Sequence, residues 1–314
     1  MFSYFGHLFL TTLYAYFGLT CRFIRNAPGI RHCIDLVNSI LLAALRTGPL
    51  PKHVAFIMDG NRRFAKHKKI PVEGGHSVGA ARLVKILTAC YNLKIKEVSV
   101  YAFSIENFNR SEEEVKNLFN LLRDRLTTVT SDDNQSALDM GQIKIRVIGN
   151  KSMIPEDILK DLEEIEEKKK HYTGGILNIC APYTSRDEIC YSLQQITSDA
   201  SDGNIENVAV IDSDYVRDRF YYGPDSAHVD LLVRTSGVTR LSDYLLWQCN
   251  ENSTIHFTGT LWPDFTSIEL LRILVDWSFN RFLNLDDPES SQIFKSVPLD
   301  TLQKPPPLAT VTKN

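Results

Sequence analysis

The sequence predicts an α/β fold: a single six-stranded, mainly parallel sheet flanked by helices, with a hydrophobic helical extension at the N-terminus. Between residues 51 and 283, short and nearly continuous apolar runs alternate with amphipathic helical patterns. Such runs are typical of strands that helices cover on both faces. Strand-helix alternation is typical of parallel strands joined by right-handed crossovers. The composition, 43% hydrophobic and 23% charged in 314 residues, is that of a globular protein.

Six short segments rich in β-branched residues are predicted to be strands. In chain order they are His53–Met58, Glu97–Phe103, Ile143–Ile148, Gly175–Ala181, Val229–Val233 and Thr254–Phe257. Seven segments with apolar residues at helical spacing are predicted to be helices: Val78–Tyr91, Glu112–Leu126, Glu156–Lys170, Ser185–Thr197, Asp214–Phe220, Asp243–Cys249 and Ser267–Phe282. Ser111 and Glu114 form a capping box at the start of the second helix. The polar stretch Ser198–Asn207 is predicted to be a loop.

Residues 1–50 are predicted to be a helical segment that associates with a membrane. Between Met1 and Cys21 there is no Lys, Arg, Asp or Glu, and aromatic and aliphatic residues dominate. The stretch is marginal as a spanning helix, which needs about 20 apolar residues, whereas its aromatic rings favour the membrane interface. It lacks the basic region and the cleavage site of a signal peptide. The alternative is that this segment caps the core.

The remaining chain is expected to divide into a main domain over residues 51–283 and a polar, proline-containing tail over residues 284–314. The net charge of -3 gives no basic excess, so we expect no nucleic-acid partner. Six cysteines occur without a CxxC pair or metal-ligand spacing, which predicts reduced, buried thiols and no zinc site.

The first candidate site follows the first predicted strand, where ligands of parallel sheets bind. The run there is Asp59-Gly60-Asn61-Arg62-Arg63-Phe64. A carboxylate can hold Mg²⁺, and two guanidinium groups can each clamp phosphate oxygens through two hydrogen bonds. The run therefore suits a metal-bound polyphosphate. Taken alone, the run favours the alternative of an ordinary Asp-Gly turn beside solvated basic residues.

Three further runs add groups that can bind anions. Gly74-Gly75-His76-Ser77-Val78-Gly79 predicts a glycine-rich start to a helix, whose free N–H groups can bind an anion; a simple capping loop is the alternative. The other two runs follow the second and fifth strands. They supply Ser104, Asn107 and Arg110, and Arg234, Arg240 and Ser242. In a parallel sheet all of these residues converge on one rim.

An apolar groove is predicted beside this rim. The helix Val78–Tyr91 offers small and aliphatic residues there, namely Ala80, Ala81, Val84, Leu87 and Thr88. The alternative is that these side chains are ordinary core packing. A phosphate cradle next to an apolar groove suggests an isoprenoid diphosphate as ligand.

Several runs resemble, in the same order, the motifs of cis-prenyltransferases. They are His53–Lys66, Gly75–Ala80, Val100–Arg110, Arg234–Gly237, Arg240–Gln248 and Leu261–Phe265. The resemblance covers roughly Pro51 to Phe282 and implies an undecaprenyl diphosphate synthase-like fold. The double arginine of Asp-Gly-Asn-Arg-Arg looks like the eukaryotic dehydrodolichyl diphosphate synthase branch. That branch adds isopentenyl diphosphate units to farnesyl diphosphate and makes a long-chain polyprenyl diphosphate, the precursor of dolichol for protein glycosylation.

The resemblance also implies a role for each matching residue. Asp59 would hold Mg²⁺ and orient the leaving diphosphate. The allylic diphosphate would be bound by Gly60, Asn61, Arg62, Arg63, His76 and Arg110, with Phe64 nearby. Isopentenyl diphosphate would be bound by Arg234, Arg240 and Ser242. Ser104 and Asn107 would lie where the proton is removed.

Departures from the family pattern imply a partner subunit, and they leave Asp59 as the one protein ligand for the metal ion. Bacterial members have a second metal-binding Glu where this chain has Ser253, and an arginine where it has Val72. Homodimeric members carry an Arg-x-Gly motif near their end, and none follows Trp262 here. The resemblance therefore implies a heteromer in which a Nogo-B-receptor-like subunit supplies that motif. It also implies a location on the cytosolic face of the endoplasmic reticulum membrane or on lipid droplets.

Two other classes of protein share parts of this pattern. A Mg²⁺-dependent phosphohydrolase also begins with an Asp at a strand end, but haloacid-dehalogenase enzymes need a second Asp where Asn61 stands. A non-catalytic scaffold subunit of a prenyltransferase complex would lose the Asp-Gly-Asn motif that this chain keeps.

Overall fold

The computed structural model describes residues 45, 48–130, 142–205, 207–224, 228–250 and 252–285. The predicted N-terminal segment (1–50) and the predicted tail (284–314) lie almost entirely outside these ranges. Within the described ranges no helix is long and apolar enough to cross a membrane.

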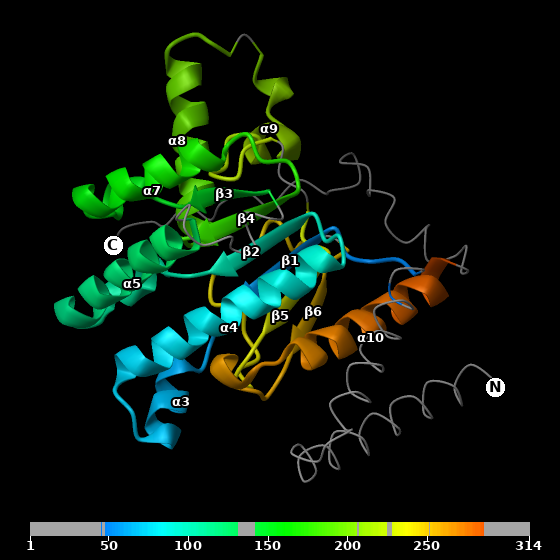
Figure 1. Cartoon of the computed structure of the whole chain (residues 1–314). Coiled ribbons are helices and arrows are strands. Elements are labelled where there is room, and N and C mark those ends of the chain that lie inside the picture. Colours follow the sequence, from blue (N-terminus) through cyan, green and yellow to red (C-terminus); the bar gives the residue numbers. More distant parts are fainter. Residues whose placement is uncertain are drawn as a thin grey trace, which may run out of the picture.

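Six strands form one sheet in the order β3-β4-β2-β1-β5-β6, and each neighbouring pair is parallel. The predicted six-stranded sheet is confirmed, and each strand ends within two residues of its predicted boundaries. Figure 1 shows the strands running in one direction through the centre of the molecule. Their bounds are β1 His53–Ile57, β2 Glu97–Tyr101, β3 Ile143–Ile148, β4 Gly175–Cys180, β5 Leu231–Arg234 and β6 Thr254–Phe257.

Helices flank the sheet, as predicted (Figure 1). The α-helices are α3 Asn61–Lys68, α4 Val72–Asn92, α5 Glu112–Thr130, α7 Glu156–Lys169, α8 Ser185–Ser201, α9 Ser213–Arg217 and α10 Ser267–Leu285. Four short 3-10 helices are η1 Ile105–Asn109, η2 Lys151–Met153, η3 Val208–Val210 and η4 Trp262–Asp264. α8 extends four residues beyond its predicted end, into the segment expected to be a loop.

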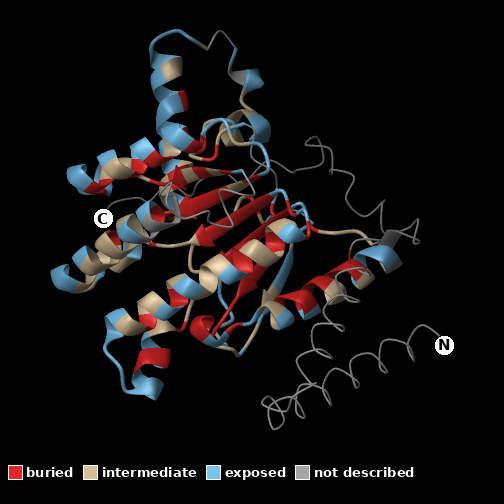
Figure 2. Cartoon of the chain, viewed as in Figure 1, coloured by how far each residue is buried: buried red, intermediate tan, exposed pale blue. Residues whose placement is uncertain are grey.

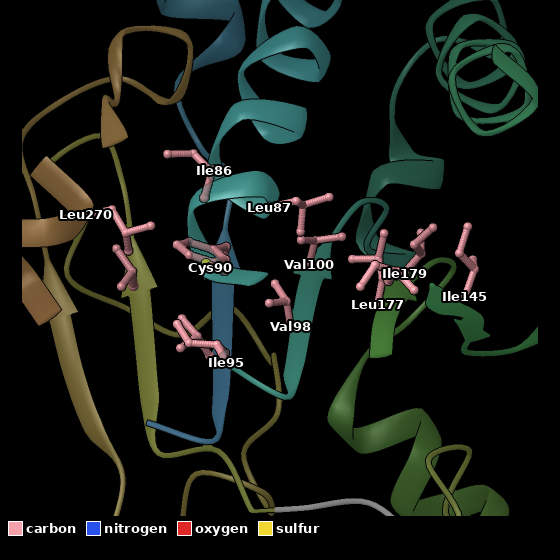
Figure 3. Close-up of a cluster of buried hydrophobic side chains, with 14 of the residues drawn as sticks. Ile86, Leu87, Cys90, Ile95, Val98, Val100, Ile145, Leu177, Ile179 and Leu270 are labelled. Carbon is pink, nitrogen blue, oxygen red and sulfur yellow. The ribbon is translucent and has the colours of Figure 1, made fainter. Parts of the chain in front are cut away.

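The core has two layers because alternate residues of a strand point to opposite faces of the sheet. On one face α4, α5, α7 and α10 cover the strands, and Figure 3 shows Leu87 of α4 next to Val100 of β2. On the other face Tyr183, Tyr244 and other aromatic residues pack against β1 and β5. Burial of β1 and β5 on both faces (Figure 2) explains their nearly continuous apolar sequences, whereas the edge strand β6 is largely exposed.

The predicted helix Asp243–Cys249 is wrong, because this segment forms bends and turns instead. Part of its backbone bonds to the start of α8: the Ser185 N–H donates to the Asp243 carbonyl (2.8 Å), and the Leu246 N–H donates to Ser185 Oγ (2.9 Å). Within the segment, the Cys249 N–H donates to the Leu245 carbonyl (2.9 Å). Tyr244 and Leu245 are fully buried. Tertiary contacts therefore override the helical pattern here.

The prediction of buried cysteines holds only in part. Cys90 and Cys180 are buried, whereas Cys190 of α8 is exposed. The described cysteines are free thiols, and no group of three or more possible metal ligands from His, Cys, Asp and Glu occurs among the described residues.

Candidate active site

The candidate site lies at the carboxyl end of β1, which has a neighbouring strand on each side. β1 pairs with β2 on one side and with β5 on the other, and ligands of open α/β sheets bind at such a switch point, beyond the carboxyl ends of the strands. Asp59 follows β1, and Arg234 is the last residue of β5. Their side chains meet, with Arg234 Nη2 donating to Asp59 Oδ2 at 2.9 Å. The Arg234 side chain is 3% exposed and that of Asp59 is 33% exposed.

Asp59 is ionised in this setting. Burial alone would raise the pKa of its carboxyl group, but the hydrogen bond with Arg234 and the positive charges of Arg234 and Arg63 outweigh this effect. The net result is a pKa below the usual range. Arg63 Nη2 lies 3.6 Å from Asp59 Oδ1, so both carboxylate oxygens face a guanidinium group.

The loops after β1 and β5 are joined by further hydrogen bonds. Thr235 Oγ1 accepts from the Asp59 N–H (3.0 Å) and donates to the Asp59 carbonyl (2.7 Å). Arg63 Nη1 donates to the Ser236 carbonyl at 2.9 Å. These bonds fix the carboxylate relative to both strands.

Arg234 also contacts a second group of polar residues, on the loop after β5. Its Nη1 donates to Ser242 Oγ at 2.8 Å and also to the Arg240 carbonyl. Arg240 Nε donates to the same hydroxyl at 3.2 Å. Arg234 therefore links Asp59 to Arg240 and Ser242, the predicted anion-binding groups after the fifth strand, and the predicted convergence of these residues is observed.

The run after β2 folds into η1. Ser104 Oγ accepts from the Glu106 N–H (3.2 Å), and Asn107 Oδ1 accepts from the Ser104 N–H (3.0 Å), so the two side chains form a capping box. The Asn107 Nδ2 group has no partner among the described residues. Arg110 lies four residues before Glu114 and pairs with it at 2.7 Å.

The predicted helix start at Val78 is wrong, because α4 begins at Val72. Gly75 and His76 therefore lie beyond the free N–H groups of the helix, and the Gly75 N–H donates to the Pro71 carbonyl at 3.3 Å; Gly74 lies within the first turn. A Cβ on Gly75 would lie 2.5 Å from the Asn61 carbonyl oxygen, so this glycine permits close packing of α4 on α3. The helix whose free N–H groups follow β1 is α3, which sequence reasoning missed; Gly60, at φ 111°, precedes it.

His76 still faces the site from within α4. Its Nε2 is buried and has no hydrogen-bond partner in the described part of the chain. Burial, and then the positive charge of Arg110, lower its pKa. A bound anion would supply the missing partner and favour a protonated ring.

A cavity of about 1030 Å³ unites these groups. Twelve of the thirteen predicted site residues line it; they are Asp59, Gly60, Asn61, Arg62, Arg63, His76, Ser104, Asn107, Arg110, Arg234, Arg240 and Ser242. Phe64 is the exception, because its side chain is buried (7% exposed) and does not line the cavity.

Below the charged mouth the cavity is apolar. Ala80, Ala81, Val84 and Leu87 of α4 line it as expected, whereas Thr88 does not; its hydroxyl donates to the Val84 carbonyl. Sequence reasoning did not predict the rest of the apolar wall. It comprises Leu118, Leu121, Leu122 and Leu126 of α5 and Leu177 and Ile179 of β4. It also missed Glu106, Arg186 and Asp243 at the mouth.

A charged mouth above a long apolar cavity defines a site for a molecule with an anionic head and a hydrocarbon chain. Comparison with known proteins agrees. The family model described as "Putative undecaprenyl diphosphate synthase" matches residues 57–282. A dehydrodolichyl diphosphate synthase complex subunit of Saccharomyces cerevisiae is 38% identical over 262 residues, which cover 83% of this chain and 75% of that protein. A subunit of the same description from Schizosaccharomyces pombe is 39% identical over 252 residues, covering 80% and 94%.

A solved structure shares the fold as well. Lavandulyl diphosphate synthase from Lavandula x intermedia, in complex with dimethylallyl diphosphate, superposes with a TM-score of 0.66 at 29% identity and covers 73% of this chain and 95% of its own. The chain therefore belongs to the cis-prenyltransferase family, and it is a prenyl-transferring enzyme. This confirms the predicted family and overturns the phosphohydrolase and scaffold alternatives.

Proposed function

We propose that this enzyme adds isopentenyl diphosphate units to farnesyl diphosphate and makes a long-chain dehydrodolichyl diphosphate, the polyprenyl precursor of dolichol for protein glycosylation. The observation that carries the proposal is the Asp59–Arg234 pair at the mouth of an apolar cavity of about 1030 Å³. Guanidinium groups suit diphosphate oxygens, and a cavity with aliphatic walls suits a growing hydrocarbon chain.

The two diphosphates are assigned to two separate groups of donor residues. In this proposal the allylic diphosphate is bound by Gly60, Asn61, Arg62, Arg63, His76 and Arg110. Isopentenyl diphosphate is bound by Arg234, Arg240 and Ser242. Because Arg234 contacts both Asp59 and Ser242, the two substrates lie side by side with their reacting carbons toward the cavity.

The residues present fit a magnesium ion. Mg²⁺ in phosphate-transferring sites takes one or two carboxylates and completes its shell with substrate oxygens and water. Asp59 is an ionised, partly exposed carboxylate on the cavity wall, so we propose it as the protein ligand. When bound, Mg²⁺ would offset the negative charge that develops on the departing diphosphate.

The chain's own groups organise the condensation. The bond between the allylic carbon and its diphosphate breaks, and Arg63 and Arg110 stabilise the electron pair that leaves with the diphosphate. The double bond of isopentenyl diphosphate attacks this carbon, and loss of a proton completes the new cis double bond. Asn107 and Ser104 are proposed to lie at the point of proton removal, where the free Nδ2 group of Asn107 can position the diphosphate.

The remaining predictions concern the cellular setting. We propose that residues 51–283 form the catalytic domain, that residues 1–50 associate with the membrane, and that residues 284–314 are a tail. The related yeast proteins are named as subunits of a complex, which supports a heteromer with a Nogo-B-receptor-like subunit. The cytosolic face of the endoplasmic reticulum is the proposed location.

Incubation of the full chain with farnesyl diphosphate, labelled isopentenyl diphosphate and Mg²⁺, with and without the partner subunit, tests this function. The expected product is a ladder of polyprenyl diphosphates, with vigorous synthesis only when the partner is present. Release of inorganic phosphate or diphosphate without formation of a carbon–carbon bond would refute it. Vigorous synthesis without a partner would refute the heteromer.

A further inference from the structure

Arg186 connects two loops of the site, and the proposed function gives it no role. It is the second residue of α8, and its side chain lines the cavity mouth although it is 72% exposed. Its Nε donates to Asp243 Oδ2 at 2.7 Å, and its Nη2 donates to Glu106 Oε1 at 3.3 Å. Glu106 belongs to η1, next to Asn107, whereas Asp243 follows Ser242. One guanidinium group thus links the loops after β2 and β5.

The loop after β5 needs such support. Ser242, Asp243 and Leu245 have φ angles of 53°, 59° and 48°, in the left-handed region that residues other than glycine rarely adopt. Conformations of this kind persist only where surrounding contacts impose them. Here the start of α8 supplies these contacts, because the Arg186 N–H donates to Asp243 Oδ1 at 3.2 Å and the Ser185 N–H donates to the Asp243 carbonyl.

Stability of the fold does not account for this arrangement. Exposed ion pairs contribute little to folding, and Arg217 of α9 offers a direct comparison. It pairs with Asp214 at 2.6 Å and with Asp218 at 3.0 Å, but it does not line the cavity. The two carboxylates that hold Arg186 instead belong to the two segments that carry Asn107 and Ser242.

We propose that Arg186 is a positioning residue for isopentenyl diphosphate. It holds the loop that carries Arg240 and Ser242 against η1, so that the diphosphate cradle and Asn107 keep a fixed separation. It acts through Asp243 and Glu106, whose carboxylates accept from its Nε and Nη2 groups. This inference rests on the proposed function.

Steady-state kinetics of the full chain test the inference. Arg186→Ala is expected to raise the KM for isopentenyl diphosphate roughly tenfold while the KM for farnesyl diphosphate changes less than about twofold. The melting temperature should stay within about 2 °C of the wild-type value. Arg186→Lys should restore part of the loss, and the matched control Arg217→Ala should leave both KM values unchanged.

Asp243→Asn separates positioning from direct binding, because asparagine tolerates the left-handed backbone but releases the Arg186 guanidinium. A positioning role predicts a raised KM for isopentenyl diphosphate, and no further rise in the Arg186→Ala/Asp243→Asn double variant. A lowered KM would mean that Arg186 binds the diphosphate itself and would overturn the inference.

Equilibrium binding of isopentenyl diphosphate, measured by calorimetry, gives a readout that does not need turnover. Arg186→Ala is expected to weaken this binding by a similar factor. An unchanged affinity and an unchanged KM would overturn the positioning role while leaving the proposed function intact. A wild-type chain that binds both diphosphates but forms no carbon–carbon bond with its partner would overturn the proposed function instead.

Discussion

Single residues set the charge at the mouth of the cavity. Arg234 is almost fully buried, and its one carboxylate partner among the described residues is Asp59. Since a buried guanidinium group needs a paired anion, the two residues form a unit. The half-exposed Arg63 then completes the surroundings of the carboxylate.

Asp59→Asn keeps the shape of the side chain but removes the negative charge. We expect a loss of activity of about 100-fold or more, because the proposed metal ligand is gone. The free energy of unfolding should fall by about 1–2 kcal/mol, because Arg234 loses a charged hydrogen-bond partner. Condensation assays and urea unfolding check the two effects. Full activity of this variant with Mg²⁺ would contradict the assigned role.

Glu188 carries a second prediction at this scale. Burial raises the pKa of its carboxyl group from the ordinary 4.5 to about 7, although Tyr183 and Gln248 donate to it at 2.7 and 2.9 Å. Because the folded-state pKa is the higher one, this group stabilises the fold below pH 4.5, and the contribution is lost as the pH rises through 7.

Glu188→Gln should therefore remove part of the pH dependence of stability. The wild-type chain is expected to lose stability relative to this variant between pH 5 and about 8, measured by urea unfolding at several pH values. Parallel curves for the two proteins over this range would show that the carboxyl titrates normally.

At the scale of elements, α3 and α4 place four polar residues of the allylic site on the cavity wall. They are Asn61, Arg62 and Arg63 of α3 and His76 of α4. α3 starts directly after Asp59-Gly60, and α4 packs on it at Gly75. Gly79 allows a second close approach, since a Cβ there would lie 2.2 Å from Asn61 Oδ1. Gly75 and Gly79 therefore serve helix packing.

Gly75→Ala should destabilise the protein by about 1–3 kcal/mol because its new methyl group overlaps the Asn61 carbonyl oxygen. Activity should fall as Asn61 shifts. Gly74→Ala is the matched control: its methyl group would meet the flexible end of Ile70 at 3.3 Å. The gain in helix propensity should stabilise it by about 0.5 kcal/mol. Thermal unfolding distinguishes the two, and equal effects would contradict the packing role.

The sequence was sufficient to predict the central strands such as β1 and β5, because their apolar runs reflect burial on both faces. It was also sufficient for most of the mouth, because Asp59, Asn107 and Arg234 follow strands that end at one edge. It failed where tertiary contacts decide the backbone, as in the turn at Ser242–Leu245 and the start of α4. The α5 wall was missed because a helix face that borders a cavity has the same pattern as one that borders a core.

At the scale of the whole molecule, the sheet and two helices enclose a single space for the hydrocarbon chain. α4, α5, β2 and β4 contribute its walls, and the loops after β1, β2 and β5 contribute its mouth. Since one cavity joins both parts, the depth of the apolar part should limit the product.

Leu122→Trp on α5 should shorten the polyprenyl products because the larger side chain fills part of the cavity. The first condensation should continue at a rate within about threefold of the wild type, because the mouth is unchanged. Leu193→Trp on α8, where the side chain is 47% exposed and outside the cavity lining, is the control. Products of unchanged length from Leu122→Trp would mean that the chain grows elsewhere.

The most direct test of the proposed site is a crystal structure of the protein with isopentenyl diphosphate and a non-hydrolysable farnesyl diphosphate analogue. We expect the allylic diphosphate beside Asp59 and Arg63, the second diphosphate on Arg234 and Ser242, and the farnesyl chain between α4 and α5. A farnesyl chain bound on another surface, with the cavity between these helices empty, would contradict it.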